Sequence, residues 1–130
     1  MLNQPSLQGV EIAAKRLKGL ARVTPLEFNK RLSKIISASV FLKREDLQQV
    51  RSFKIRGAYN KISSLKKEEI TSGIVCASAG NHAQGFAFCC QKLEIKGEVY
   101  MPATTPQQKV SQVRMFGADF VDIILVGDTY

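Results

Sequence analysis

Two short segments of the sequence combine residue types that could bind an anion or react covalently with a ligand. They are residues 52–58, SFKIRGA, and residues 77–85, ASAGNHAQG. Each segment lies where an apolar, strand-like run gives way to a helical pattern of apolar residues. In α/β proteins ligands bind at the carboxyl ends of strands, so both positions are candidate sites.

The second segment can be interpreted from its physical chemistry alone. Ser78, Gly80 and Asn81 lead into a helix whose first backbone N–H groups and positive dipole end would face outward, which predicts an anion-binding loop. The segment lacks the Lys-Ser/Thr of a P-loop, and with only Gly80 and Gly85 it lacks the dinucleotide fingerprint. The alternative is that Ser78 or Asn81 only caps the helix.

Lys54 is harder to interpret, because most lysines near a helix start are solvated surface residues. Its neighbours Phe53 and Ile55 are apolar, so the amine could be partly desolvated. A desolvated lysine is a candidate nucleophile or Schiff-base former. Spacing alone leaves both interpretations open.

The predicted elements belong to the α/β class. The pattern predicts a helix capped by Ser6, a strand at 40–42, a helix at about 53–66, a strand at 74–77, a helix at 81–93, a strand at 99–101, a helix at 106–117 and a strand at 120–126. Strands that alternate with helices at these short spacings predict a parallel sheet with right-handed crossovers.

Composition excludes several classes of protein. The 130 residues, 45% hydrophobic and 23% charged, are typical of a folding domain. The net charge of +8 could indicate nucleic acid or an anionic membrane, but no motif for either is present, which favours a solvated basic face. Cys76, Cys89 and Cys90 show no metal-ligand or disulfide spacing, and no apolar run could span a membrane. We therefore expect a cytoplasmic protein with reduced core thiols, no metal, no nucleic acid and no membrane partner.

KREDLQ at residues 43–48, SFKIRGAYN at 52–60 and SAGNHAQG at 78–85 together resemble the fold-type II pyridoxal-phosphate enzymes. This family is tryptophan synthase beta-like, with parallel sheets and flanking helices. Among its branches the chain is most similar to biosynthetic threonine dehydratases (threonine ammonia-lyases), from about Val23 to Tyr130.

The resemblance implies roles for particular residues. Lys54 would hold pyridoxal 5'-phosphate as a Schiff base and act as the catalytic base, Phe53 would lie against the cofactor ring, and Asn81 would hydrogen-bond its phenolic oxygen. The loop that receives the substrate carboxylate would be formed by Ser78, Ala79, Gly80, Asn81 and His82. Loop structure is the implied role of His82, the sole histidine.

The implied reaction is dehydration and deamination of L-threonine to 2-oxobutanoate and ammonia, the first step towards isoleucine, or of L-serine to pyruvate. Ile55 stands where threonine and cysteine synthases carry Asp, and His82 stands where cysteine synthases carry Thr. Ala79 stands where serine racemases place a second serine, and a methyl group cannot move a proton. Serine racemase and serine dehydratase remain the alternatives within the fold. Ion pairs of Glu45, Asp46 and Arg56 would support the lysine segment without being catalytic.

The resemblance also implies that this chain is the N-terminal portion of a larger enzyme. Residues 1–72 would belong to the large cofactor domain and residues 73–130 to the small α/β domain, both incomplete. The glycine-rich phosphate loop and the Ser or Cys facing the pyridine nitrogen would follow Tyr130. The full-length enzyme would be a homo-oligomer that acts on a small amino acid. The competing hypothesis is a non-catalytic remnant or an interaction module.

Overall fold

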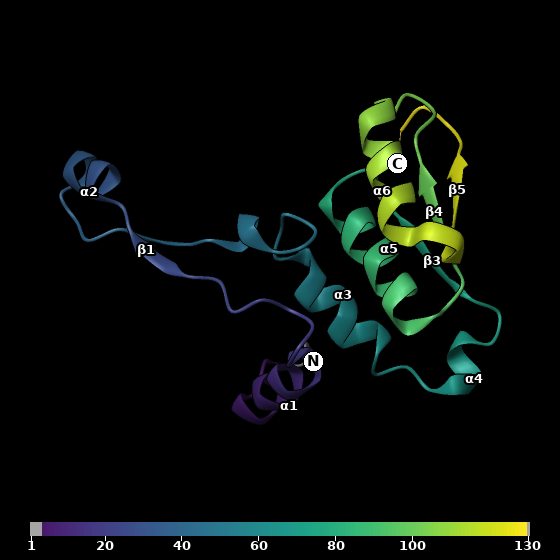
Figure 1. The fold of residues 1–130 in the computed structure, drawn as a ribbon, viewed down its shortest axis with the longest axis horizontal. Helices are drawn as coiled ribbons and strands as arrows, with labels where there is room; N and C mark the ends of the chain where they lie inside the picture. Colours follow the sequence, from purple (N-terminus) through teal and green to yellow (C-terminus); the bar gives the residue numbers. More distant parts are fainter. Residues whose placement is uncertain (1–3, 130) are drawn as a thin grey trace.

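The computed structural model describes residues 4–129, so the ends of the two expected domains, residues 1–3 and Tyr130, lie outside the described residues. The described chain has a compact part built on a three-stranded sheet and an extended arm near its N-terminus (Figure 1). Helix α3 (Lys54–Ile62) lies between the two parts.

The compact part is the α/β unit that the sequence predicts. Strands β3 (Ile74–Ala77), β4 (Gly97–Met101) and β5 (Val121–Leu125) are parallel and lie in the order β3-β4-β5. Helices α5 (Asn81–Leu93) and α6 (Gln107–Gly117) connect them and pack on one face of the sheet (Figure 1). The predicted parallel sheet is confirmed.

Helix α5 is buried on all sides through residues 83–90. The sheet and α6 cover part of its surface, and α3 packs on the rest. A helix enclosed in this way has apolar residues around its whole circumference rather than on one stripe. Burial raises the pKa of the Cys76 thiol to about 11 and that of Cys89 and Cys90 to about 12. The three cysteines are free and buried, as expected for core thiols.

The N-terminal part contains α1 (Leu7–Leu17), whose predicted cap is confirmed because Ser6 Oγ accepts a hydrogen bond from Gly9 N at 3.1 Å. Helix α1 packs against α3, where Arg16 Nη1 donates to Asn60 Oδ1 at 3.1 Å. Strand β1 (Leu26–Phe28) follows.

The arm consists of β1, α2 (Lys30–Ile36) and β2 (Phe41–Lys43). The two strands pair antiparallel, and the rings of Phe28 and Phe41 lie 5.4 Å apart between centroids. Strand β1 and helix α2 are not individual elements in the sequence-based prediction. Isolated two-stranded hairpins are marginally stable in water.

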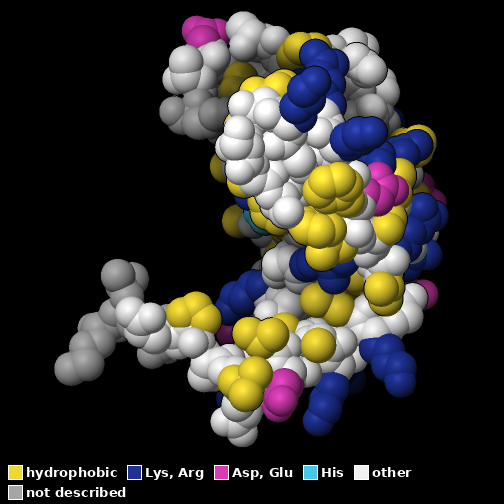
Figure 2. Space-filling model, turned by 90° about the vertical axis from the view of Figure 1, so that its left-hand side faces the viewer, with side chains coloured by type: hydrophobic (Ala, Val, Ile, Leu, Met, Phe, Trp, Pro, Cys, Tyr) yellow, Lys and Arg dark blue, Asp and Glu magenta, His cyan; other side chains and the backbone are white. Residues whose placement is uncertain are grey.

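Apolar side chains remain exposed on the arm, and Figure 2 shows such side chains interspersed with separate Lys and Arg residues on one face of the molecule. Leu26, Phe28, Ile35, Ile36 and Phe41 are each more than half exposed. Among the described residues, no helix is both long and apolar enough to cross a membrane.

Several details of the helices and strands differ from the sequence-based prediction. Helix α3 ends at Ile62 rather than near residue 66, and a separate short helix, α4 (Lys67–Ile70), follows it. A 3-10 helix, η1 (Glu45–Leu47), lies between β2 and α3, so the lysine segment does not follow a strand directly. Helix α6 ends at Gly117 as predicted, but the left-handed residue is Ala118, with φ of 46°.

The reason for a glycine at position 117 is close packing. A Cβ there would lie 2.6 Å from Val121 Cβ, which no real contact tolerates. We expect Gly117→Ala to lower the free energy of unfolding by about 1 to 3 kcal/mol, as overpacking does. The matched control is Gly57→Ala in α3, where a Cβ meets nothing within 4 Å. This control should gain about 0.5 to 1 kcal/mol from helix propensity. Urea denaturation of both variants measures the difference, and equal effects would contradict the packing explanation.

Candidate functional site

Lys54 is the first residue of α3, and its side chain is exposed rather than desolvated. Of the two interpretations that the sequence leaves open, the solvated lysine is the one observed in this chain, because each helical residue is rotated by about 100° from the last. That rotation turns Ile55 fully into the core, whereas Phe53 is 59% exposed. The Lys54 amine nitrogen lies 5.2 Å from the centroid of the Phe53 ring. An accessible amine and an accessible aromatic ring are therefore presented side by side.

The loop between β3 and α5 has the conformation of an open helix start. Ser78 N donates to Tyr100 O at 3.1 Å and so extends the sheet by one residue. Ser78 Oγ accepts from Gly80 N at 3.3 Å, and Gly80, the N-cap residue of α5, makes no side-chain cap. The alternative in which Ser78 or Asn81 caps α5 is therefore wrong. Asn81 and His82 begin the helix and are exposed.

Gly85 brings the two segments together. A Cβ on Gly85 would lie 3.3 Å from Lys54 C and 3.3 Å from Ile55 N, so α5 and the first turn of α3 are in backbone contact. Neither helix has a side-chain cap among the described residues, so two positive dipole ends lie in one region of the molecule. Helix starts of this kind attract anionic groups.

Ser52 was missed by the sequence analysis as a site residue. It is 6% exposed, and its Oγ has no hydrogen-bond partner within the part of the chain that the structure describes. A buried hydroxyl without a partner costs about 1 to 3 kcal/mol, so such groups normally have one. Its position directly before Phe53 and Lys54 is the signal that could have identified it.

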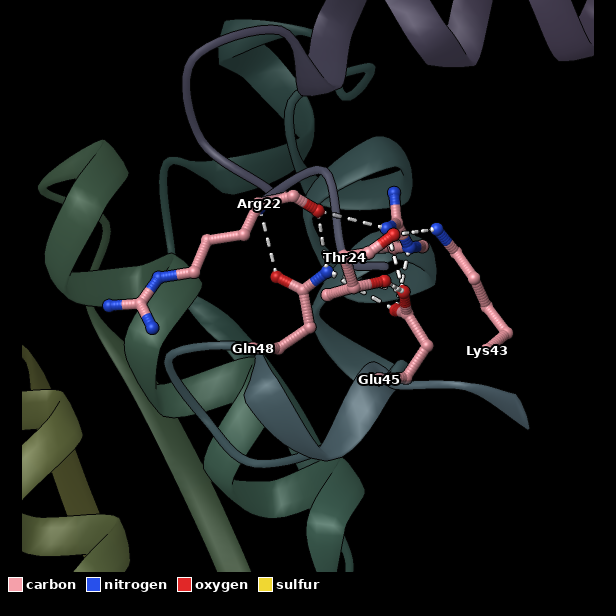
Figure 3. Close-up of polar contacts among 6 residues, drawn as sticks. Arg22, Thr24, Lys43, Glu45 and Gln48 are labelled. Atoms are coloured by element: carbon pink, nitrogen blue, oxygen red, sulfur yellow. Dashed lines mark hydrogen bonds and ion pairs between the residues drawn. The ribbon is translucent and has the colours of Figure 1, made fainter. Parts of the chain in front are cut away.

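Glu45 is the centre of a cluster of polar contacts beside the first turn of α3 (Figure 3). Its carboxylate accepts from Arg56 Nε at 2.8 Å and Nη2 at 2.9 Å, and from Thr24 Oγ1 at 2.5 Å. The Arg56 guanidinium lowers the pKa of Glu45 to about 2, and the Thr24 hydroxyl contributes in the same direction. Asp46 pairs with Arg44 at 2.8 Å. The expected ion pairs of Glu45, Asp46 and Arg56 are confirmed.

Two hollows lie near these elements. One of about 430 Å³ is bordered by α3, β3 and α5, with Gly57, Ile74 and His82 in its lining. The other, of about 580 Å³, lies between α1 and Arg56 and includes Val23. Across residues 4–129, no group of three or more His, Cys, Asp and Glu side chains is arranged to hold a metal ion.

A family model described as pyridoxal-phosphate dependent enzyme matches residues 17–130. The chain therefore belongs to this family, which confirms the resemblance of the sequence motifs. The L-threonine dehydratase biosynthetic IlvA of Bacillus subtilis is 57% identical to it over 118 residues, which are 91% of this chain but 28% of that protein. The chain thus spans less than a third of this curated relative.

Solved structures of relatives have the same fold. The processed form of threonine deaminase isoform 2 from Solanum lycopersicum superposes with a TM-score of 0.81 at 45% identity, covering 92% of this chain and 32% of that one. Maize serine racemase superposes with a TM-score of 0.87 at 28% identity, covering 95% of this chain and 37% of that one. The predicted fold-type II architecture is confirmed by these neighbours.

The side chains around Lys54 suit the cofactor of the family, which is an aromatic aldehyde with a phosphate group. The exposed Lys54 amine can react with an aldehyde, and the exposed Phe53 ring can cover a flat heterocycle. The uncapped helix starts can attract anionic oxygen. The residues present therefore fit the group.

The Glu45 contacts predict an acid-sensitive part of the protein's stability. The pKa of Glu45 falls from 4.5 to about 2 on folding, so the stabilisation is complete above the unfolded value and is lost as pH falls through the folded value. We expect about 3 kcal/mol of the free energy of unfolding to disappear between about pH 5 and pH 2. Urea denaturation over this range should show that Glu45→Gln removes this part of the pH dependence. An unchanged pH profile in the variant would contradict it.

Proposed function

We propose that this chain is part of a threonine dehydratase, a pyridoxal-phosphate dependent lyase that converts L-threonine to 2-oxobutanoate and ammonia, with L-serine as a second substrate. The observation that carries the proposal is the contact of Gly85 with Lys54, which joins the SFKIRGA and SAGNHAQG segments in one site. The 57% identity to a threonine dehydratase supports the choice of reaction. Because the chain covers 28% of that relative, the activity belongs to the complete gene product.

In this proposal Lys54 Nζ holds the cofactor, Phe53 lies against the cofactor ring, and Asn81 donates a hydrogen bond to its phenolic oxygen. The accessible amine and ring, 5.2 Å apart, support the first two roles. When bound, the cofactor accepts the electron pair released at the substrate's alpha carbon. The substrate carboxylate is received by the loop Ser78, Ala79, Gly80, Asn81 and His82.

The residues of this chain then bind, orient and move one proton. The open start of α5 fixes the carboxylate through backbone N–H groups, which holds the alpha C–H bond in a defined direction. Once the substrate amine has replaced it on the cofactor, the freed Lys54 Nζ would remove the alpha proton and return it to the beta hydroxyl, which leaves as water. Water then replaces nitrogen in the released enamine, which gives 2-oxobutanoate and ammonia. His82, at the second position of α5, serves the loop structure.

The division into domains is also a proposal, with residues 1–72 in a large domain and 73–130 in a small one. The position of the whole parallel sheet within residues 74–125 supports it. We further propose that the complete enzyme is a cytoplasmic homo-oligomer of the isoleucine pathway. The three free, buried cysteines are consistent with a reducing compartment.

Two other functions compete with this proposal. A non-catalytic remnant would keep the fold without the chemistry, and a serine racemase would use the same fold, as the TM-score of 0.87 to maize serine racemase illustrates. Ala79 is the residue that argues against racemisation, because its methyl group cannot return a proton to the opposite face of the substrate.

Replacement of the lysine tests the main proposal. In the complete gene product, Lys54→Ala should lose covalent cofactor and release no detectable 2-oxobutanoate from L-threonine, because no other group in this site supplies the amine. Borohydride reduction followed by peptide mapping locates the attached cofactor, and Lys61→Ala on the same helix should behave like the wild type. A trapped adduct at another lysine would sink the assignment. If the wild-type protein binds no cofactor, the non-catalytic alternative holds.

A second substitution tests the choice between elimination and racemisation. Ala79→Ser places a hydroxyl where a racemase needs one, so we expect a slow appearance of D-serine from L-serine alongside continued pyruvate formation. Chiral chromatography measures the D-isomer, with Ala79→Val as a control that adds bulk without a group that can move a proton. D-serine production by the wild type at a rate comparable to pyruvate formation would refute the interpretation of Ala79.

A further inference from the structure

We infer that Glu45 and Arg56 are positioning residues that fix the first turn of α3 and thereby place the Lys54 amine for the proposed reaction. We call Glu45, Arg56, Gln48, Thr24 and the backbone of Arg22 the Glu45 clamp. The inference rests on the proposed function of Lys54. Glu45 and Arg56 touch neither substrate nor cofactor in the proposed reaction. Their effect on the reaction comes from the position of Lys54.

The first part of the clamp is the ion pair between Glu45 and Arg56. Glu45 lies on η1, before the lysine segment, and Arg56 lies on α3, two residues after Lys54. Two nitrogens of the guanidinium donate to the two carboxylate oxygens, at 2.8 Å and 2.9 Å. A planar fork on a carboxylate fixes direction as well as distance, which a single contact does not.

A third segment completes the clamp. The Arg22 carbonyl oxygen accepts from Gln48 Nε2 at 2.9 Å and from Arg56 Nη2 at 3.1 Å, and Arg22 N donates to Gln48 Oε1 at 3.0 Å. Gln48 is 1% exposed, so its two bonds to Arg22 are largely shielded from water, whereas the bond from Arg56 to Arg22 is exposed. Figure 3 shows Gln48 pointing toward the backbone of Arg22, whose own side chain points away, and Thr24 beside the Glu45 carboxylate.

The clamp matters for Lys54 because it adds polar contacts to a helix start that is otherwise held by packing, with Ile55 fully buried and Gly85 against the backbone. Phe53 provides no side-chain cap, and the Lys54 side chain itself is exposed. Gly85 presses on the backbone of Lys54 and Ile55, and Arg56 holds the same turn through the clamp. Loss of the clamp would let the turn shift relative to α5, and with it the distance from the amine to the substrate.

The neighbouring pair Arg44–Asp46 provides a matched control. Asp46 is adjacent to Glu45 and is also ion-paired, but its side chain is 57% exposed and its partner lies on the same segment. The side chain of Glu45 is 15% exposed and its partner lies on α3. Both substitutions remove one negative charge, but only Glu45→Gln also removes a contact with α3. An effect seen in Glu45→Gln alone is therefore due to the lost contact.

The experiment measures steady-state kinetics of the complete gene product with L-threonine. We expect Glu45→Gln to lower kcat by about tenfold to 100-fold, since a shift of the order of 1 Å has such effects, while KM changes by less than about threefold. KM should change little because the loop that receives the substrate carboxylate lies at the start of α5, outside the clamp. Cofactor should stay attached to Lys54, with a changed pH dependence of its visible absorption. Asp46→Asn should match the wild type in every measurement.

Arg56 supplies a second series if Glu45→Gln does not fold. Arg56→Lys keeps the charge without the fork, so its kcat should lie between that of the wild type and that of Arg56→Ala. Equal kcat for Glu45→Gln and Asp46→Asn, or no recovery from Arg56→Ala to Arg56→Lys, would overturn the inference. If either result is obtained and Lys54→Ala is inactive, the inference fails but the proposed function stands. If Lys54→Ala is active, the proposed function itself fails.

Discussion

The contact between Gly85 and the backbone of Lys54 and Ile55 is the constraint on which the arrangement of the molecule depends. A Cβ placed on Gly85 would lie 3.3 Å from Lys54 C and 3.3 Å from Ile55 N. A larger residue at this position would therefore have to displace its neighbours. The contact lets α5 be enclosed, with the sheet and α6 on one side and α3 on the other. The same contact packs the lysine segment against the helix that follows the loop at residues 78–82, so core packing sets the relative position of the two segments.

Electrostatics supplies the second constraint. A partly buried carboxylate is costly unless each of its oxygens is paired, and Glu45 has Arg56, Thr24 and Gln48 around it. With 19 basic and 11 acidic residues, the chain has few carboxylates, and Glu45 is set among cations and hydrogen-bond donors. Its side chain bonds to residues 11 and 21 positions away in the chain, which short-range helix and strand preferences cannot predict.

The sequence predicted the compact part well and the arm poorly. The bounds of β3 and α5 agree with the prediction, because an apolar run, a small polar turn and a long apolar helix are strong local signals. Strand β1 was missed because its three residues are defined by pairing with β2 rather than by a pattern of their own. The exposure of Lys54 could not be decided from the sequence, because its neighbours do not reveal the rotation of the helix. Ser52 was missed because a hydrogen-bond deficit exists only in three dimensions. Family membership was confirmed, whereas the roles of individual site residues stay predictions.

The exposed hairpin has a consequence for biosynthesis. Strands β1 and β2 leave the ribosome before any of the sheet β3-β4-β5, yet Phe28 and Phe41 pack against each other and remain more than half exposed. Segments with exposed apolar surface associate readily with other incomplete chains. The hairpin of β1 and β2 is therefore synthesised before the sheet β3-β4-β5, although the sheet is the part that can become stable first. Holdase chaperones would find their binding sites on the nascent chain in the residues that are made early.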